Sequence, residues 1–196
     1  MCLMTCNKLL QRMVLVLVIL SWPVLSCPPQ SVKRFIIAES RVSFVSTAPH
    51  ETISAFSTAM KGLINPSSGA FAFSIHNTTF SGFNNPLQKE HFNENYMETD
   101  KYPDCSFSGR IIDDIDFSKQ GVITVRAKGL LLIRGVSKER IIKAQVSVKE
   151  NELLISALFD VPLQDHDIRI PRLVYQKIAP VVTVTLNASM KREARP

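Results

Sequence analysis

Residues 120–163, QGVITVRAKGLLLIRGVSKERIIKAQVSVKENELLISALFDVPL, contain three consecutive segments in which apolar and polar side chains alternate. Ile123 and Val125, for example, fall on one face of the first segment. Successive side chains of an extended chain point to opposite faces, so a period of two indicates strands with one buried and one solvated face. The short connections Gly135-Val136-Ser137 and Glu150-Asn151 predict that these strands are antiparallel neighbours.

The same alternation continues on both sides of this stretch, from residue 34 to residue 190. It is weakest over residues 52–62. Strands do not alternate with helices, which argues against a doubly wound nucleotide-binding sheet. The pattern therefore predicts an all-β fold, a single eight-stranded antiparallel barrel. Its strands are expected near residues 34–46, 52–62, 69–81, 104–113, 120–134, 138–149, 152–163 and 180–190.

Two segments interrupt the alternation and predict short helices. Asn85-Pro86 opens the first, with Asn in the capping position and Pro at the first helical position. In that helix Leu87, Phe92 and Tyr96 would face the barrel. The second is expected over residues 171–178, before Pro180.

The N-terminal residues have the pattern of an export signal. Lys8 and Arg12 precede an unbroken apolar run, residues 13–20, which is too short for a membrane-spanning helix. Cleavage after Ser26 by ordinary signal peptidase would leave Cys27 first, whereas a lipobox reading of residues 24–27 would make Cys27 a lipidated membrane tether. The expected organisation is a signal peptide (1–26), a leader (27–33), the barrel domain (34–190) and a tail (191–196).

Composition describes an ordinary globular chain of 196 residues with a net charge of +6. Removal of Lys8 and Arg12 with the signal lowers that charge to +4. Basic and acidic residues alternate in the charged clusters, without the aromatic stacking surface that nucleic-acid binding uses, so nucleic acid is not an expected partner. Cys105 lies in an alternating segment and is expected to be a small buried residue.

The sequence lacks the motifs of common catalytic and metal sites, including HExxH, CxxC, GxSxG and phosphate-binding glycine loops. The cluster Asp165-His166-Asp167 would need three neighbouring side chains to converge on one ion, which extended backbone prevents. We expect it to hold its segment by hydrogen bonds. His91 is the better polar candidate, because its helix would lie at the barrel mouth. No catalytic residue, metal or cofactor is predicted.

Five fragments in the same order resemble landmarks of the YceI-like family, and two of them, residues 81–96 and 165–179, resemble a Bacteroidetes-type subgroup. The fragments are Ser40-Arg-Val-Ser-Phe44, Lys101-Tyr-Pro103 with Phe107, residues 129–138, residues 81–96 and residues 165–179. The resemblance covers residues 34–190. It implies a lipocalin-like barrel in the periplasm or secreted, with an apolar tunnel that holds a polyisoprenoid chain such as that of a quinone. Segment 85–97 and Ile170-Pro171-Arg172 depart from the family pattern.

The main hypothesis is therefore a non-enzymatic protein of the bacterial envelope that binds, transports or stores an apolar lipid. A polar contact from His91 is expected at the mouth. The residues expected to line the tunnel are Val42, Phe44, Phe71, Phe73, Ile75, Phe92, Tyr96, Phe107, Val125, Ile133, Val146, Ile155, Phe159 and Val184. One alternative is a packed barrel without a ligand, acting as a structural or interaction lipoprotein tethered through Cys27. Another is an enzyme that uses His91 with Glu90 or Glu94.

Overall fold

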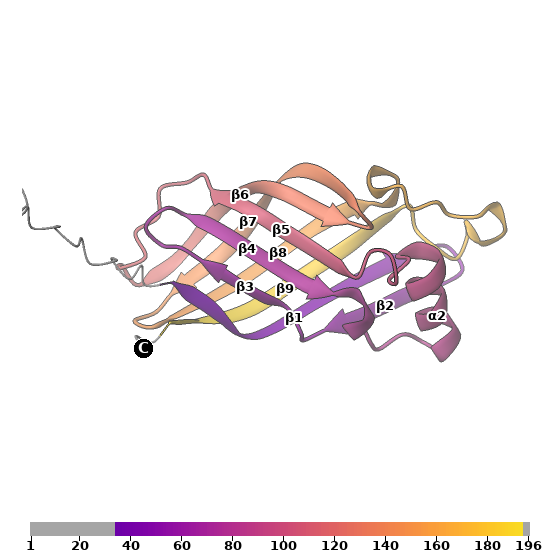
Figure 1. Cartoon of the computed structure of the whole chain (residues 1–196), viewed down its shortest axis with the longest axis horizontal. Coiled ribbons are helices and arrows are strands. Elements are labelled where there is room, and N and C mark those ends of the chain that lie inside the picture. The colour runs from indigo at the N-terminus through magenta and orange to yellow at the C-terminus, as the bar shows by residue number, and fades with distance from the viewer. Residues whose placement is uncertain (1–33, 194–196) are drawn as a thin grey trace, which may run out of the picture. The chain divides into compact units, whose positions relative to one another are not determined.

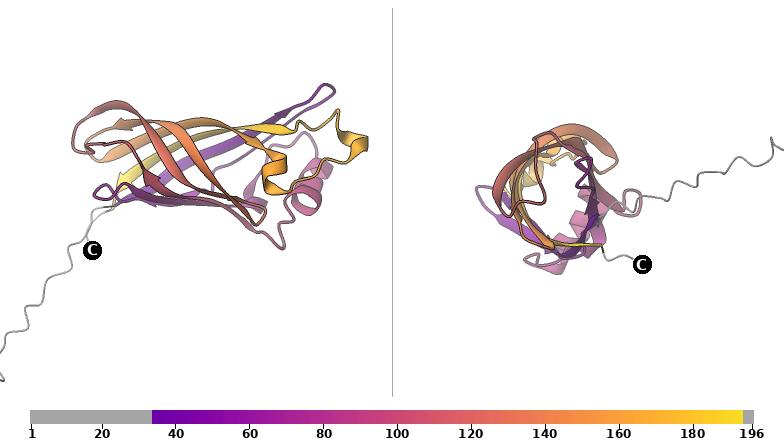
Figure 2. Two further views of the ribbon diagram at one scale, coloured as in Figure 1. Left: turned by 90° about the horizontal axis from the view of Figure 1, so that it is seen from above. Right: turned by 90° about the vertical axis from the view of Figure 1, so that its left-hand side faces the viewer.

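The computed structural model describes residues 34–193, which curl into one closed antiparallel β-barrel (Figure 1). The first and last strands pair with each other and close the wall, so the barrel is a ring when it is viewed along its axis (Figure 2). In chain order the elements are β1 (Phe35–Thr47), β2 (Thr52–Ser57), β3 (Lys61–Ile64), β4 (Ala70–His76), η1 (Asn77–Thr79), α2 (Pro86–His91), η2 (Phe92–Tyr96), β5 (Asp104–Ile111), β6 (Gly121–Ile133), β7 (Val136–Val148), β8 (Glu152–Pro162), η3 (Leu163–His166), η4 (Arg172–Val174) and β9 (Val181–Arg192).

The prediction of an eight-stranded lipocalin-like barrel is confirmed, although the strand expected over 52–62 is divided in two. Both β2 and β3 pair with β1, so together they occupy one position in the wall. Between them the chain leaves the sheet, and the buried Ser57 Oγ lies 2.7 Å from Thr79 Oγ1. Met60 packs inward at the break. This interruption accounts for the weak alternation of the segment.

The strand expected over 69–81 ends earlier, at His76. Asn77 is fully buried, and its side chain donates a hydrogen bond of 2.8 Å to the carbonyl oxygen of Tyr102. Its backbone N–H donates to the carbonyl oxygen of Pro103 at 2.7 Å. These bonds turn the chain into η1 and away from the sheet.

The first predicted helix is present and the second is much shorter than expected. Asn85 Oδ1 accepts a hydrogen bond of 2.9 Å from the backbone N–H of Gln88, and α2 continues into the single π-helical turn η2. The helix expected over 171–178 is only the 3₁₀ turn η4. Turn-type hydrogen bonds continue to Ile178, whose N–H donates to the carbonyl oxygen of Val174 at 3.2 Å. The carbonyl oxygen of Gln176 accepts from His50 N–H at 2.9 Å, because Pro180 has no N–H to offer it.

The two ends of the barrel differ. Elements α2, η2 and the segment 163–180 lie together at one end, which we call the mouth end (Figure 1). At the other, closed end, buried side chains from several strands form a packed core. The fully buried members of that core are Phe35, Leu153 and Met190, and Phe117 packs against Phe35 with ring centres 6.1 Å apart.

The predicted signal peptide, leader and Cys27 lie outside the described residues, as does most of the predicted tail. Within residues 34–193, none of the helices is long and apolar enough to cross a bilayer.

Candidate functional site

The interior of the barrel contains one continuous cavity with a volume of about 520 Å³. Strands from around the whole wall line it, and α2, η2 and the segment 163–178 line it at the mouth end. The side chains that face it are predominantly apolar, because each strand turns its apolar face inward. The packed core lies beyond it at the closed end. The barrel is therefore neither a fully packed core nor an open pipe.

All fourteen residues that the sequence predicted for the tunnel line this cavity, and His91 lines it too. Four of them are also members of the packed core and form the boundary between core and cavity, namely Phe71, Val125, Val146 and Ile155. That the fourteen residues contact a ligand stays a prediction. Cys105, expected as a small buried residue, is largely buried and faces the same space.

Aromatic rings are gathered near the mouth. Phe44 on β1 stacks on Phe92 of η2, with ring centres 5.5 Å apart and planes 16° from parallel. Phe83 lies 5.2 Å from Phe92, and Phe80 lies 5.6 Å from Phe44. Phe80 and Phe83 were not among the predicted tunnel residues, because a strand was expected to end at residue 81. Gly82, which has a φ of 86°, signals the turn that brings both rings inward.

A second aromatic group lies on β4 and β5. Phe71 and Phe107 are 4.9 Å apart between ring centres, and Phe71 and Phe73 are 5.7 Å apart. All three rings face the cavity. Flat, polarisable surfaces of this kind suit an unsaturated or branched hydrocarbon as well as a saturated one.

A small polar network fastens the helix to the turn between β1 and β2. Gln88 Nε2 donates to Glu51 Oε1 at 2.5 Å, and Asn84 Nδ2 donates to the carbonyl oxygen of Thr52 at 3.0 Å. Glu51 and Gln88 line the cavity beside His91 and Lys177. Of these four residues only His91 was predicted from the sequence, because Glu51, Gln88 and Lys177 come from segments far apart in the chain. Polar groups therefore lie at the mouth, where a ligand's polar end would be.

Burial raises the pKa values of two cavity-lining groups that can ionise. Burial raises the pKa of the Cys105 thiol to about 12 and outweighs the hydrogen bonds from the Arg134 main chain and the Asn77 side chain, which lower it. Burial also raises the pKa of Tyr96 above its ordinary value. Neither group carries a charge at neutral pH, and the charged side chains that line the cavity, Glu51 and Lys177, belong to its mouth.

The described residues contain no group of three His, Cys, Asp or Glu side chains placed to hold a metal ion. His91 is exposed at the end of α2 and lines the cavity. The Asp165–Asp167 cluster fastens its segment, as predicted, but its backbone is the 3₁₀ turn η3 followed by Asp167 in the left-handed region, not the extended chain that was expected. His166 Nδ1 lies 3.0 Å from the carbonyl oxygen of Val136, and Asp165 pairs with Arg140 at 3.7 Å.

A barrel with an apolar cavity and helices at one end is the arrangement that the family resemblance implies. The model of the YceI-like domain matches residues 35–190, which is most of the chain. The chain belongs to the YceI-like family. The Bacteroidetes-type subgroup stays a prediction. A search of curated protein sequences finds no match.

Solved structures show the same fold at low sequence identity. A polyisoprenoid-binding domain from Saccharophagus degradans, implicated in plant cell wall breakdown, has a TM-score of 0.69 and 12% identity, over 83% of this chain and 99% of that one. BcnA from Burkholderia cenocepacia has a TM-score of 0.64 and 13% identity, over 76% and 95%. A mutant Campylobacter jejuni YceI protein with a monobromobimane guest has a TM-score of 0.51 and 13% identity, over 90% and 93%. At these identities the likeness shows the fold.

Proposed function

We propose that this YceI-like protein binds the hydrocarbon chain of one apolar lipid, a polyisoprenoid or quinone-like molecule, inside its barrel and does so without catalysis. The observation that carries the proposal is the cavity of about 520 Å³ with its apolar lining. Transfer of hydrocarbon from water into such a space gains ~25 cal/mol per Å² buried. The similarity to the polyisoprenoid-binding domain of Saccharophagus degradans supports the same ligand class.

The cavity volume limits the length of the enclosed chain. A cavity of ~150 Å³ holds one benzene ring, which corresponds to roughly 25 Å³ per carbon atom. By the same measure the present cavity has room for roughly 20 carbons, or about four isoprene units. A longer chain would extend past Phe92 and Phe83 into the mouth. The polar end of the ligand would then lie beside His91, Gln88 and Lys177.

We further propose that the protein is exported and carries or stores its lipid in the bacterial envelope. The charged and apolar pattern of residues 1–26 supports export. Mass spectrometry of the N-terminal peptide from the native host tests this directly. A mature chain that begins at Cys27, with or without a diacylglyceryl group, is expected, and an intact residue 1 would contradict export.

Ligand binding is tested by filling the cavity. Ala157 on β8 faces the cavity, whereas the next residue, Leu158, is 68% exposed on the outer wall. We expect Ala157→Phe to reduce binding of geranylgeraniol, a 20-carbon isoprenoid alcohol, at least tenfold. Leu158→Phe is the matched control and should bind normally. Native mass spectrometry measures both, and circular dichroism checks the fold. Equal binding by the two variants would overturn the proposal.

A further inference from the structure

The mouth end carries apolar side chains that no part of the described barrel covers. Leu173 is 96% exposed and Tyr175 is 63% exposed, and both lie in or next to η4. Leu87 on the neighbouring helix α2 is more than half exposed as well. Large apolar residues this exposed cost solvation free energy, so a cluster of them at one end of a molecule indicates a contact surface.

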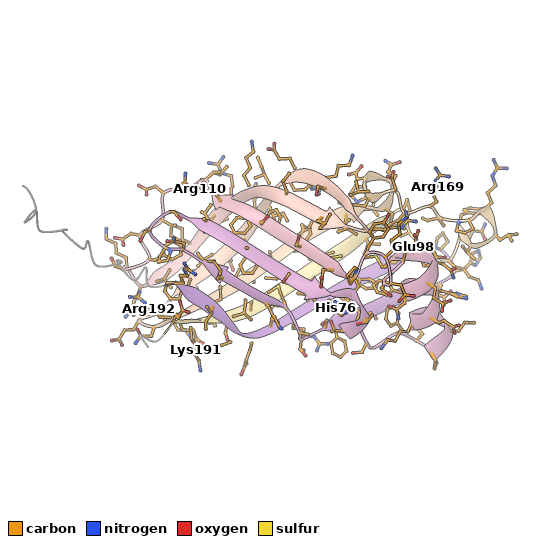
Figure 3. The ribbon with its side chains drawn as sticks, viewed as in Figure 1. His76, Glu98, Arg110, Arg169, Lys191 and Arg192 are labelled. Carbon is orange, nitrogen blue, oxygen red and sulfur yellow. The ribbon has the colours of Figure 1, made fainter. Side chains whose placement is uncertain are left out.

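The same segment is cationic. Arg169, Arg172 and Lys177 fall within residues 168–180, and that stretch contains no acidic residue. Within residues 34–193, none of these three cations forms an ion pair. Of the two acids just before the segment, Asp165 is already paired with Arg140. Figure 3 places Arg169 at the mouth end and Arg110, Lys191 and Arg192 at the closed end.

The segment is held in place at its base. The backbone N–H of Ala179 donates a buried hydrogen bond of 2.9 Å to Ser46 Oγ, and Gln176 accepts from His50 as described above. Val174 and Ile178 face the cavity, while Leu173 and Tyr175 face outward. One short segment thus forms both the wall of the cavity mouth and an exposed, cationic tip.

We propose that this tip, residues 168–180, docks on the surface of an anionic lipid bilayer. Leu173 and Tyr175 enter the interfacial layer, and Arg169, Arg172 and Lys177 contact lipid phosphates. Aromatic and aliphatic side chains flanked by cations are the pattern of interfacial binding, and each cation near an anionic membrane adds to the attraction. Because the tip borders the cavity mouth, docking places that mouth against the lipid phase. Docking needs no ligand in the cavity, so it can succeed or fail independently of the proposed function.

Fluorescence from single tryptophans tests the contact in the full chain. Trp22, the only natural tryptophan, is first replaced by Phe. Leu173→Trp then reports from the tip, and Val122→Trp, at a residue 69% exposed near the closed end, is the matched control. We expect vesicles of phosphatidylglycerol and phosphatidylcholine to shift the Leu173→Trp emission to the blue and bromolipids to quench it. The control tryptophan should show neither change.

Charge dependence completes the test. Vesicles of phosphatidylcholine alone, or 0.5 M NaCl, should weaken the response, and Arg169→Gln with Arg172→Gln should lower the partition coefficient for anionic vesicles roughly tenfold. Equal responses at positions 173 and 122, or none at position 173, would overturn the proposal. A blue shift that needs no vesicles and grows with protein concentration would also overturn it, by showing that a second copy of the chain covers the tip.

Discussion

The guanidinium of Arg134 donates a hydrogen bond of 2.5 Å from Nη1 to the main-chain oxygen of Asp167. Through Nη2 the same group pairs with the carboxylate of Glu98. Glu98, Arg134 and Asp167 have φ values of 48°, 48° and 56°, and in residues 34–193 they are the non-glycine residues with positive φ. Such backbone costs roughly 1–3 kcal/mol per residue. One side chain therefore joins three strained turns at the mouth end.

Removal of this link should destabilise the barrel. Arg134 and Glu98 are only 21% and 32% exposed at their side chains, so Arg134→Ala would leave a partly buried carboxylate without its partner. We expect a loss of about 2–3 kcal/mol in the free energy of unfolding, measured by urea denaturation. Arg134→Lys should not restore this stability. The planar guanidinium of arginine can donate to Glu98 and to Asp167 at the same time, whereas the compact ammonium group of lysine cannot.

Lys128→Ala is the control for this variant. Lys128 pairs with Glu139 at 3.2 Å, but both side chains are well exposed. An exposed pair contributes little, so we expect a change within about 0.5 kcal/mol. If Arg134→Ala were no more destabilising than Lys128→Ala, the three turns would be stable without the link.

The barrel and the residues that line its cavity can both be predicted from the period-two alternation of the sequence. Each wall strand has one side facing inward, so a period of two in the sequence identifies residues such as Phe107 and Phe159 directly. The mouth is different. Glu51, Gln88 and Lys177 come together from three separate segments by tertiary contacts that leave no local pattern. Phe83 faces the cavity because of the turn at Gly82, outside the alternating pattern of a strand.

The contrast between local pattern and tertiary contact also explains why a helix was predicted over residues 171–178 where the structure has only the 3₁₀ turn η4. Pro171 and the residues after it can form a helix locally. The hydrogen bond of Ala179 N–H with Ser46 Oγ takes the place of the helical bond to Tyr175, and Pro180 cannot continue a helix. Local preference is weak, at tenths of a kcal/mol per residue, and such tertiary bonds exceed it.

Two glycines set the spacing between β5 and β6. Gly109 and Gly129 are cross-strand partners, and a Cβ atom on Gly129 would lie 2.3 Å from the main-chain oxygen of Ser108. Backbone atoms cannot give way as a flexible side chain can. Gly129→Ala should therefore cost about 2–3 kcal/mol of stability, measured by thermal unfolding monitored with circular dichroism. Ser108→Ala, at an exposed neighbouring position, is the control, and an equal loss from both would contradict this role of Gly129.

The thiol of Cys105 should be unreactive in the folded protein. The thiolate is the reactive form, and a pKa of about 12 leaves very little of it at neutral pH. We expect iodoacetamide at pH 8 to modify Cys105 at least a hundredfold more slowly in the native protein than in urea. Mass spectrometry of the peptide that contains Cys105 follows the reaction. Comparable rates in the native and unfolded protein would show that the thiol is accessible and ionised.

His166 should make stability depend on pH. It is fully buried at the contact between η3 and β7, and among the described residues its Nε2 atom has no hydrogen-bond partner. The 3.0 Å contact of Nδ1 with the carbonyl oxygen of Val136 requires that Nδ1 carry the proton, so Nε2 is unprotonated in the neutral ring. Burial, the largest effect, lowers the pKa of His166 below its ordinary value near 6.5.

Because the pKa of His166 is lower in the folded chain, the unfolded chain binds a proton more readily. Stability therefore rises with pH between the folded-state pKa and the ordinary value near 6.5. The contribution of the neutral ring is fully present above about pH 6.5, is lost progressively as the pH falls below that value, and stops changing once the pH is below the folded-state pKa. Urea denaturation from pH 7.5 to pH 5.5 should show this fall. His166→Asn keeps a donor for Val136 but cannot titrate, so it should flatten the curve while lowering stability at pH 7.5. His50→Asn, which makes the same substitution at an exposed position, is the matched control for loss of a histidine. An unchanged slope in His166→Asn would assign the pH dependence to other groups.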